Sequence, residues 1–286
     1  MELTFFLQTL INGIQIGFLY VLMALGLTLI FGIMHLINFA HGQLYMLGGF
    51  FLWWLFDIHH VNYVLSILLA VIIVAAIGLT IERFLLRPIR GQELYVMCMT
   101  IALGQFFEFA ARTVWGPLDK AIPPVIPGII KFAGVAITHK RLMAVVVGMA
   151  LVIGLYLFIH RTKAGLAMRA VEQDPEVATM YGMGINRTYS LVFSLGALLA
   201  AASGALMGTI MVVNPVMGTA PMLKSFMIII LGGMGSIPGA IAGGLIVGLM
   251  DSFFSSLFGI DIAYIFVFVV AFTFIIFRPR GLFGRG

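Results

Sequence analysis

The segment Phe5–Phe31 reads FFLQTLINGIQIGFLYVLMALGLTLIF and contains no charged residue. A helix needs roughly 20 apolar residues to cross the hydrocarbon core of a bilayer, so this segment is long enough to span a membrane. Further apolar runs of similar or slightly shorter length are Leu65–Ile81, Leu142–Ile159 and Ile262–Phe277. The pattern predicts a chain that crosses a membrane several times as helices.

The composition agrees with a membrane protein. Hydrophobic residues make up 62% of the 286 residues, charged residues only 9%, and the mean hydropathy is +1.14. Soluble domains carry about 25% charged residues. The apolar runs do not alternate with polar residues as the strands of an outer-membrane barrel do. We therefore expect an all-α, multi-pass helical bundle of the bacterial inner membrane, forming one transmembrane domain over residues 1–286.

Basic residues give the expected orientation. They gather in Arg83–Arg90, on both sides of an acidic stretch within about 161–188, and from Arg278 onward. By the positive-inside rule these three segments are cytoplasmic. The polar segment 115–140 is expected outside, although it carries basic residues of its own. The first residues lack the basic region of a secretory signal, so we expect a first span and not a cleaved signal. Glu2 without nearby basic residues, together with three spans before Arg83, favours an N-terminus outside, whereas a re-entrant first block would reverse this.

The number of spans reveals a conflict. The apolar stretches after the first cytoplasmic segment lie at about 94–114, 141–160, 189–213, 224–250 and 262–277. The last three lie between two cytoplasmic segments, and an odd number of spans cannot connect them. We therefore expect a broken or re-entrant helix at Leu231–Gly244 (LGGMGSIPGAIAGG), within a total of about eight spans. Irregular backbone at membrane depth occurs only where it is buried in protein or lines a cavity.

Two segments suggest an internal two-fold repeat. GIMHLINFAHG (Gly32–Gly42) and GTIMVVNPVMG (Gly208–Gly218) both place an asparagine and a second glycine at the same distances after the first glycine. Transport proteins often contain such repeats, with discontinuous helices near the substrate path. The alternative is two unrelated glycine-rich helix contacts. The first of these segments is also expected to contain a break.

Polar side chains in these segments are candidates for the substrate path. Facing lipid they would be costly, so we expect them to face protein or water. The alternative is hydrogen bonding between helices, worth about 0.6 kcal/mol per pair. The candidate residues are Asn38, His41, Gly42, Gln43, Asn214 and Gly218.

Other charged residues receive simpler interpretations. Glu108 and Arg112 have the spacing of an ion pair on one helix face. Lys224 precedes an apolar run and is expected to extend toward an interface. Asp251 and Asp261 are expected to border an outer loop.

Several function classes have no support in the sequence. His, Cys and carboxylates do not occur at metal-ligand spacing, and the nucleophile elbow of hydrolases is missing. Only His41 could serve an embedded enzyme, so we expect neither a catalytic residue, a metal nor a cofactor. No lysine follows a glycine as the phosphate-binding Walker A loop requires. If ATP drives this protein, another polypeptide binds it. The net charge of +5 reflects loop bias and not nucleic-acid binding.

The acidic stretch Arg169–Arg187 (RAVEQDPEVATMYGMGINR) predicts local structure. Asp174 suits the N-cap of a helix and Pro175 its first position, while Gly182 suits the left-handed residue after its end. The pattern predicts a short helix over about 175–181, preceded by another over about 164–172. Val177, Met180 and Tyr181 would give it an apolar face.

So short a helix is marginally stable alone and gains stability by docking. One interpretation is a coupling helix that contacts a cytosolic ATPase. The other is a helix at the lipid headgroups, which the neighbouring basic residues would favour and the acidic residues oppose.

Three blocks resemble the LivH-type permeases of branched-chain amino acid ABC importers. They are GLTLIFGIMHLINFAHGQLYMLGGF (Gly26–Phe50), RAVEQDPEVATMYGMGINRTYSLVFSLGALLAAASGALMG (Arg169–Gly208) and the glycine-rich Leu231–Gly244. The resemblance covers nearly the whole chain. It implies a permease paired with a second, homologous permease, two cytosolic ATPases and a periplasmic solute-binding protein.

The resemblance also implies roles for particular residues. The loop that contacts the ATPase would contain Glu172, Asp174, Pro175, Ala178 and Gly182, to which the apolar face adds Tyr181. The block Asn38–Gly42 would lie near the translocation path. The cargo stays open among branched-chain and other amino acids, urea and short amides. The alternative function is a stand-alone channel or facilitator for a small polar solute.

Overall fold

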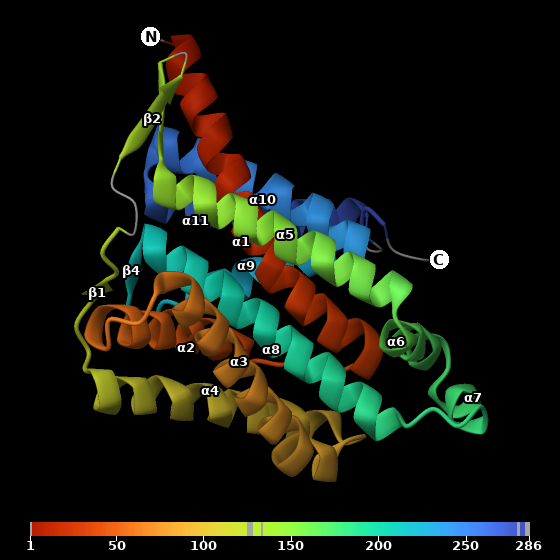
Figure 1. Ribbon diagram of the computed structural model, residues 1–286. Coiled ribbons are helices and arrows are strands. Elements are labelled where there is room, and N and C mark those ends of the chain that lie inside the picture. The colour runs from red at the N-terminus through yellow and green to blue at the C-terminus, as the bar shows by residue number, and fades with distance from the viewer. Residues whose placement is uncertain (1, 125–127, 133, 279–280, 284–286) are drawn as a thin grey trace.

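The computed structural model describes residues 2–124, 128–132, 134–278 and 281–283. Within these residues almost all regular structure is helical (Figure 1). The α-helices are α1 Glu2–Met34, α2 His41–Trp53, α3 Tyr63–Ile81, α4 Glu93–Trp115, α5 His139–Arg161, α6 Lys163–Gln173, α7 Pro175–Met180, α8 Ile185–Ile210, α9 Thr219–Gly232, α10 Ile237–Phe258 and α11 Ile260–Phe277. Short strands, β1 Lys120–Ala121, β2 Ile129–Phe132, β3 Val135–Thr138 and β4 Val212–Val213, pair as β1–β4 and β2–β3.

Six of the described helices are long and apolar enough to cross a membrane, namely those at Leu3–Met34, Tyr63–Ile89, Glu93–Trp115, His139–Arg161, Ile185–Ile210 and Ile237–Phe258. Two shorter apolar helices lie at Thr219–Gly232 and Ile262–Phe277. The multi-pass helical bundle is confirmed. The expected total of about eight spans is not confirmed, because some of the apolar helices are shorter than a full span.

The three basic segments meet at one end of the bundle, as the positive-inside rule requires. Arg90 donates a 2.8 Å hydrogen bond to Asn186, at the start of α8. Phe283, near the C-terminus, lines a cavity together with Arg169 of α6. The opposite end holds the strands, where Gln8 of α1 bonds to the backbone of Ala136 in β3. The positive-inside rule predicts that the first end is the cytoplasmic one, in which case α1 begins at the outer end.

The break expected at Leu231–Gly244 is confirmed. The apolar stretch 224–250 is divided into α9 and α10 by residues 233–236, where Gly233 and Gly235 have φ of 101° and 82°. Four helices, α8 to α11, therefore connect the second cytoplasmic segment to the third, which resolves the odd span count. A similar break separates α1 from α2.

Glycines lie at the two most extensive helix–helix interfaces, α1 with α10 and α2 with α8. Along α1 and α10, a Cβ added to Gly248 would lie 2.3 Å from the Cα of Gly17. Between α2 and α8, a Cβ on Gly204 would lie 1.8 Å from the carbonyl oxygen of Tyr45. Glycines at such positions let helix backbones approach closely in membranes, where packing drives association.

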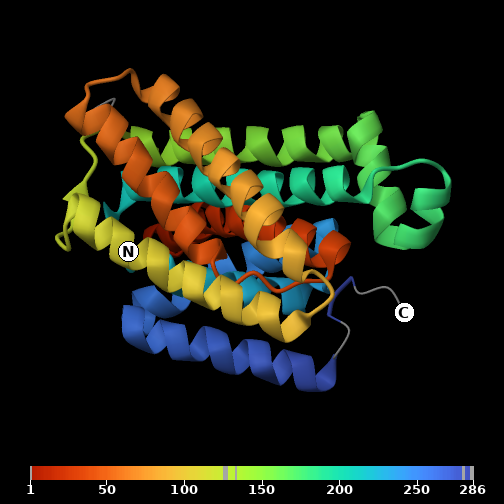
Figure 2. The same cartoon turned by 90° about the horizontal axis from the view of Figure 1, so that it is seen from below.

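The helices α1 to α4 and α8 to α11 form two similar halves. Each half has a long helix, an irregular segment, a short helix and two more helices. The long helix of each half packs against the third helix of the other, α1 against α10 and α8 against α3. α1 and α8 also lie side by side and run in opposite directions (Figures 1 and 2). The two-fold repeat that the sequence suggested is thus present, with inverted orientation.

Candidate functional site

Residues 35–40 join α1 to α2, and residues 211–218 join α8 to α9. These two irregular segments have the same hydrogen bonds at an offset of 176 residues. The Asn38 Oδ1 accepts from the backbone N–H of Ala40 at 3.1 Å, and the Asn214 Oδ1 accepts from that of Val216 at 3.2 Å. Three backbone hydrogen bonds also recur. In the first segment the N–H groups of His35, His41 and Gln43 donate to the carbonyl oxygens of Phe31, Asn38 and Ala40, respectively. In the second segment those of Met211, Met217 and Thr219 donate to Met207, Asn214 and Val216. Asparagine favours such turns because its side chain bonds the backbone two residues on. The two asparagines therefore set the chain direction at the start of α2 and α9.

Gly42 and Gly218 occupy equivalent positions in the two halves and touch each other. A Cβ added to Gly42 would lie 2.6 Å from the carbonyl oxygen of Gly218. A Cβ added to Gly218 would lie 1.9 Å from that of Gly42. Only glycine permits this approach. The two irregular segments therefore meet near the axis that relates the two halves.

Among the remaining candidates of the substrate path, Asn38, His41 and Gln43 lie inside the protein. Asn38 and His41 are fully buried, and Gln43 is 8% exposed. His41 Nε2 lies 3.1 Å from the carbonyl oxygen of Met23 in α1. Asn214 lies at the outer end, where its amide donates to Asp119 at 3.0 Å. The structure thus brings Asn38, His41, Gly42 and Gly218 together and places Asn214 at the border of this group.

A charged cluster inside the membrane domain is new. Lys224 Nζ lies 2.8 Å from both carboxylate oxygens of Asp251 and 2.9 Å from the hydroxyl of Tyr20. The Tyr20 hydroxyl donates in turn to Asp251 at 2.9 Å. The expectations that Lys224 extends to an interface and that Asp251 borders an outer loop are wrong. Both lie within helices and pair across them, whereas Asp261 lies in the first turn of α11.

The predicted ion pair of Glu108 with Arg112 is confirmed, at 2.6 Å on the outer half of α4. At the cytoplasmic end the structure adds a second pair that the sequence did not reveal. Glu82 is fully buried and bonds to Arg90 and to Ser190 of α8. This pair fixes the cytoplasmic segment after α3 to the start of α8.

The acidic stretch folds as predicted into two short helices, α6 and α7. The Asp174 Oδ1 accepts from the N–H groups of Glu176 and Val177 at 2.9 and 3.0 Å. Pro175 takes the first helical position, and Gly182 has a φ of 77°. Cap, first residue and stop therefore match the sequence pattern residue by residue.

The two helices differ in how they meet the bundle. α6 buries Gly165, Met168 and Val171 against it. α7 buries Ala178 and projects beyond the other helices at the cytoplasmic end (Figures 1 and 2). Its Met180 is 84% exposed and the adjoining Tyr181 is 81% exposed. We call Val177, Met180 and Tyr181 the α7 apolar surface.

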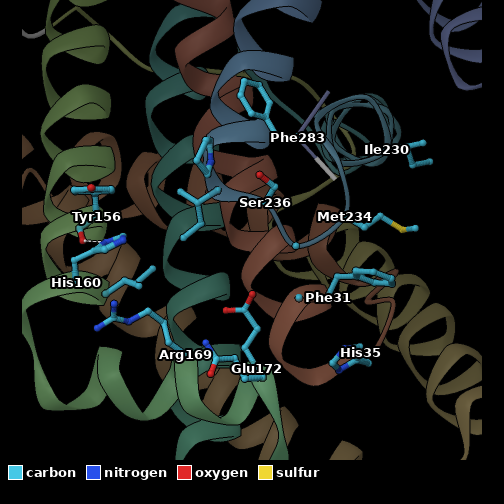
Figure 3. A pocket seen from close by; sticks show the side chains of 16 residues that line it. Phe31, His35, Tyr156, His160, Arg169, Glu172, Ile230, Met234, Ser236 and Phe283 are labelled. Carbon is cyan, nitrogen blue, oxygen red and sulfur yellow. Dashed lines mark hydrogen bonds between the residues drawn. The ribbon is translucent and has the colours of Figure 1, made fainter. Parts of the chain in front are cut away.

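A cavity of about 840 Å³ separates α6 from the break between α9 and α10. Arg169 and Glu172 of α6 line it, opposite Ser236 at the start of α10 (Figure 3). Phe31 and His35 at the end of α1 complete the lining on one side. Glu172, which we expected in the ATPase contact, lines this cavity.

Within the residues that the structure describes, no group of three or more His, Cys, Asp or Glu side chains could hold a metal ion.

Comparisons with known proteins identify similar sequences over nearly the whole chain. A family model described as "Branched-chain amino acid transport system / permease component" matches residues 9–277. The permease protein BraD of Pseudomonas aeruginosa, named for high-affinity branched-chain amino acid transport, is 35% identical over 99% of this chain and 97% of its own. The LivH permeases of Salmonella typhimurium and Escherichia coli are 31% and 30% identical over the same shares. No solved structure matches the chain.

Proposed function

Because the chain belongs to the family of permease components of branched-chain amino acid transport systems, we propose that it works with partner subunits that bind ATP and cargo. The proposed partners are a second, homologous permease, two cytosolic ATPases and a periplasmic solute-binding protein. The proposed cargo is a branched-chain or related aliphatic amino acid, as the names of the relatives suggest. The chain itself supplies the path and carries out no chemistry.

The α7 apolar surface carries this proposal. Met180 and Tyr181 are among the most exposed large side chains of the molecule, and they lie on a helix with a complete cap and stop. A six-residue helix gains little stability from its own hydrogen bonds. An exposed apolar face on such a helix is explained by a partner that covers it. We infer that this partner is the ATPase, which approaches from the cytoplasm.

Movement of α7 can reach the membrane through α6 and the cavity beside it. α6 packs against α1, α5 and α8, and its Glu172 faces the break between α9 and α10. The C-terminal segment closes the other side of the break, where the N–H of Phe283 donates to the carbonyl oxygen of Gly232. A shift of α6 would therefore change the volume of the cavity next to residues 233–236, which lack regular helical hydrogen bonds. Such segments are suited to act as hinges.

We place the substrate path near the two irregular segments, which join α1 to α2 and α8 to α9. Gly42 and Gly218 meet there, with Asn38 and His41 buried beside them. Breaks at a repeat interface are where transporters bind cargo and alternate between their two openings. The nucleotide state of the ATPase must favour one of these conformations over the other through its contacts with α6 and α7.

The test substitutes the α7 apolar surface in the complete importer, purified with its partner subunits and reconstituted in liposomes. We expect Met180→Glu with Tyr181→Ala to abolish leucine uptake and the stimulation of ATP hydrolysis by the loaded binding protein. Met180→Leu with Tyr181→Phe keeps the apolar surface and is the matched control, with activity near that of the unsubstituted importer. Normal uptake and normal stimulation in the first variant would refute the coupling role. Leucine flux through the isolated chain, without ATP or partners, would favour a facilitator.

A further inference from the structure

Lys224, Asp251 and Tyr20 form a closed ring of hydrogen bonds between three helices, α9, α10 and α1. Each of the three side chains bonds to the other two, at 2.8 to 2.9 Å. The Nζ atom of Lys224 also lies 5.5 Å from the ring centre of Tyr264 in α11. The ring is not sealed, because the side chains of Lys224 and Asp251 remain 9% and 12% exposed.

A charge pair at this depth is costly. Removing two ions from water carries a penalty that their mutual attraction repays only with good geometry, and apolar residues of similar volume often pack as well or better. Charged residues within membrane spans are for this reason rare and usually mark substrate or ion paths. The cost requires an explanation other than packing.

The equivalent positions in the other half of the internal repeat carry no charged side chain. At the offset of 176 residues, the position of Lys224 corresponds to Gly48 and that of Tyr20 to Gly196. The position of Asp251 corresponds to Ala75. A Cβ on Gly48 would lie 2.2 Å from the carbonyl oxygen of Ala201, so α2 packs closely on α8 at this position without a charged side chain. The charges are therefore a feature of one half of the repeat and not of both.

The ring is built on helices that also form the proposed path. Lys224 is on α9, the short helix that starts at Gly218, where the two breaks meet. Tyr20 lies near the middle of α1. Transporters form their substrate sites at discontinuous helices near the interface between repeats.

We propose that Lys224 and Asp251 bind the charged groups of a zwitterionic amino acid as it crosses the membrane. The carboxylate of the cargo replaces Asp251 on Lys224, and its ammonium group replaces Lys224 on Asp251. Each buried charge keeps a partner of opposite sign during this exchange, so no unpaired charge is created. The inference rests on the proposed function and deepens it by assigning the residues that select the class of cargo.

The chemistry of the exchange defines that class. A neutral solute such as urea or a short amide cannot separate the two charges, because it offers neither of them an ionic partner. A cation or an anion would leave one member of the pair unpaired and buried. Only a molecule with both charges close together, such as an α-amino acid, satisfies Lys224 and Asp251 at once.

The test measures leucine moved per ATP hydrolysed by the complete importer in liposomes, with leucine-loaded binding protein. The variant Lys224→Met with Asp251→Leu removes both charges together. We expect loaded binding protein still to stimulate its ATP hydrolysis, while the leucine-to-ATP ratio falls by about tenfold or more, since contacts to charged groups are lost. A purely structural pair would change transport and ATP hydrolysis together.

The conservative variants Lys224→Arg and Asp251→Glu keep the charges but alter their reach. We expect both to assemble and to give ratios between those of the unsubstituted importer and the neutral pair. A neutral pair with an unchanged ratio would overturn the inference. If the neutral pair does not assemble, unchanged ratios in both conservative variants would overturn it. An unsubstituted importer that moves no leucine would instead contradict the proposed function.

Discussion

Gly42 packs against Gly218, so that a Cβ built on Gly218 would lie 1.9 Å from the carbonyl oxygen of Gly42. The two residues belong to segments 176 positions apart that repeat four hydrogen bonds, including a turn formed by Asn38 and by Asn214. The weak sequence similarity between Gly32–Gly42 and Gly208–Gly218 thus marks the two-fold axis that relates α1–α4 to α8–α11. The two halves meet at the only residue type without a side chain, which brings their irregular segments together.

The contact predicts the effect of a single methyl group. Gly42→Ala should destabilise the folded protein by about 1–3 kcal/mol, because the added carbon must displace backbone rather than a flexible side chain. Thermal unfolding in detergent, followed by loss of soluble protein, measures this change. Gly154→Ala is the control, since a Cβ at Gly154 meets no atom within 4 Å. Equal melting temperatures for the two variants would contradict the contact.

The cap of α7 gives a second prediction. Asp174→Ala removes the acceptor for the N–H groups of Glu176 and Val177 and should cost about 1 kcal/mol of local helix stability. Hydrogen–deuterium exchange should become faster over residues 175–181 and stay unchanged in α8. Asp174→Ser can still accept these bonds and should exchange nearly as slowly as the original sequence. Unchanged exchange in the alanine variant would show that partners or packing, and not the cap, order α7.

The ion pair inside the membrane gives a third prediction, on stability alone. Lys224→Met leaves Asp251 buried without its cation and should cost on the order of 3–5 kcal/mol. The double variant Lys224→Met with Asp251→Leu removes both charges and should recover most of this loss. Melting temperatures of the two variants, measured in the same detergent, provide the comparison. A double variant no more stable than the single one would mean that the charges are not energetically coupled.

The orientation can be tested with a cysteine reporter. Replacing Cys98 by serine removes the single native thiol. In this background Leu118→Cys, at a site 72% exposed, should react with a membrane-impermeant maleimide added to intact spheroplasts. Tyr181→Cys, at a site 81% exposed, should react only after the membrane is opened. The reverse pattern would invert the topology and place α7 outside.

Local signals were enough to predict the acidic stretch. The residues that start and end α7, Asp174, Pro175 and Gly182, act through backbone groups within a few positions of themselves. The break before α10 was also predictable, because several glycines and a proline lie close together in Leu231–Gly244, and both residue types disfavour a continuous helix. The odd number of spans then required such a break without any knowledge of the packing.

Tertiary contacts explain what the sequence did not reveal. Lys224 and Asp251 lie 27 positions apart on different helices, and each has a reasonable interpretation alone: a snorkelling lysine and a loop aspartate. The span count failed for a different reason. Hydropathy does not distinguish a full span from a shorter apolar helix such as α9 or α11, so both kinds entered the expected total. Glu172 could not be assigned to the cavity, because the direction of a side chain on α6 depends on how α6 packs.

We propose that force reaches the membrane helices through the α7 apolar surface. A photoreactive amino acid placed at Met180 in the complete, actively transporting importer tests it most directly, with the same residue placed at Leu118 as the control. We expect a covalent adduct with the ATPase subunit from Met180, with a yield that changes between ATP-bound and nucleotide-free states, and none from Leu118. Adducts only with lipid or water at Met180, while the importer turns over, would contradict the claim.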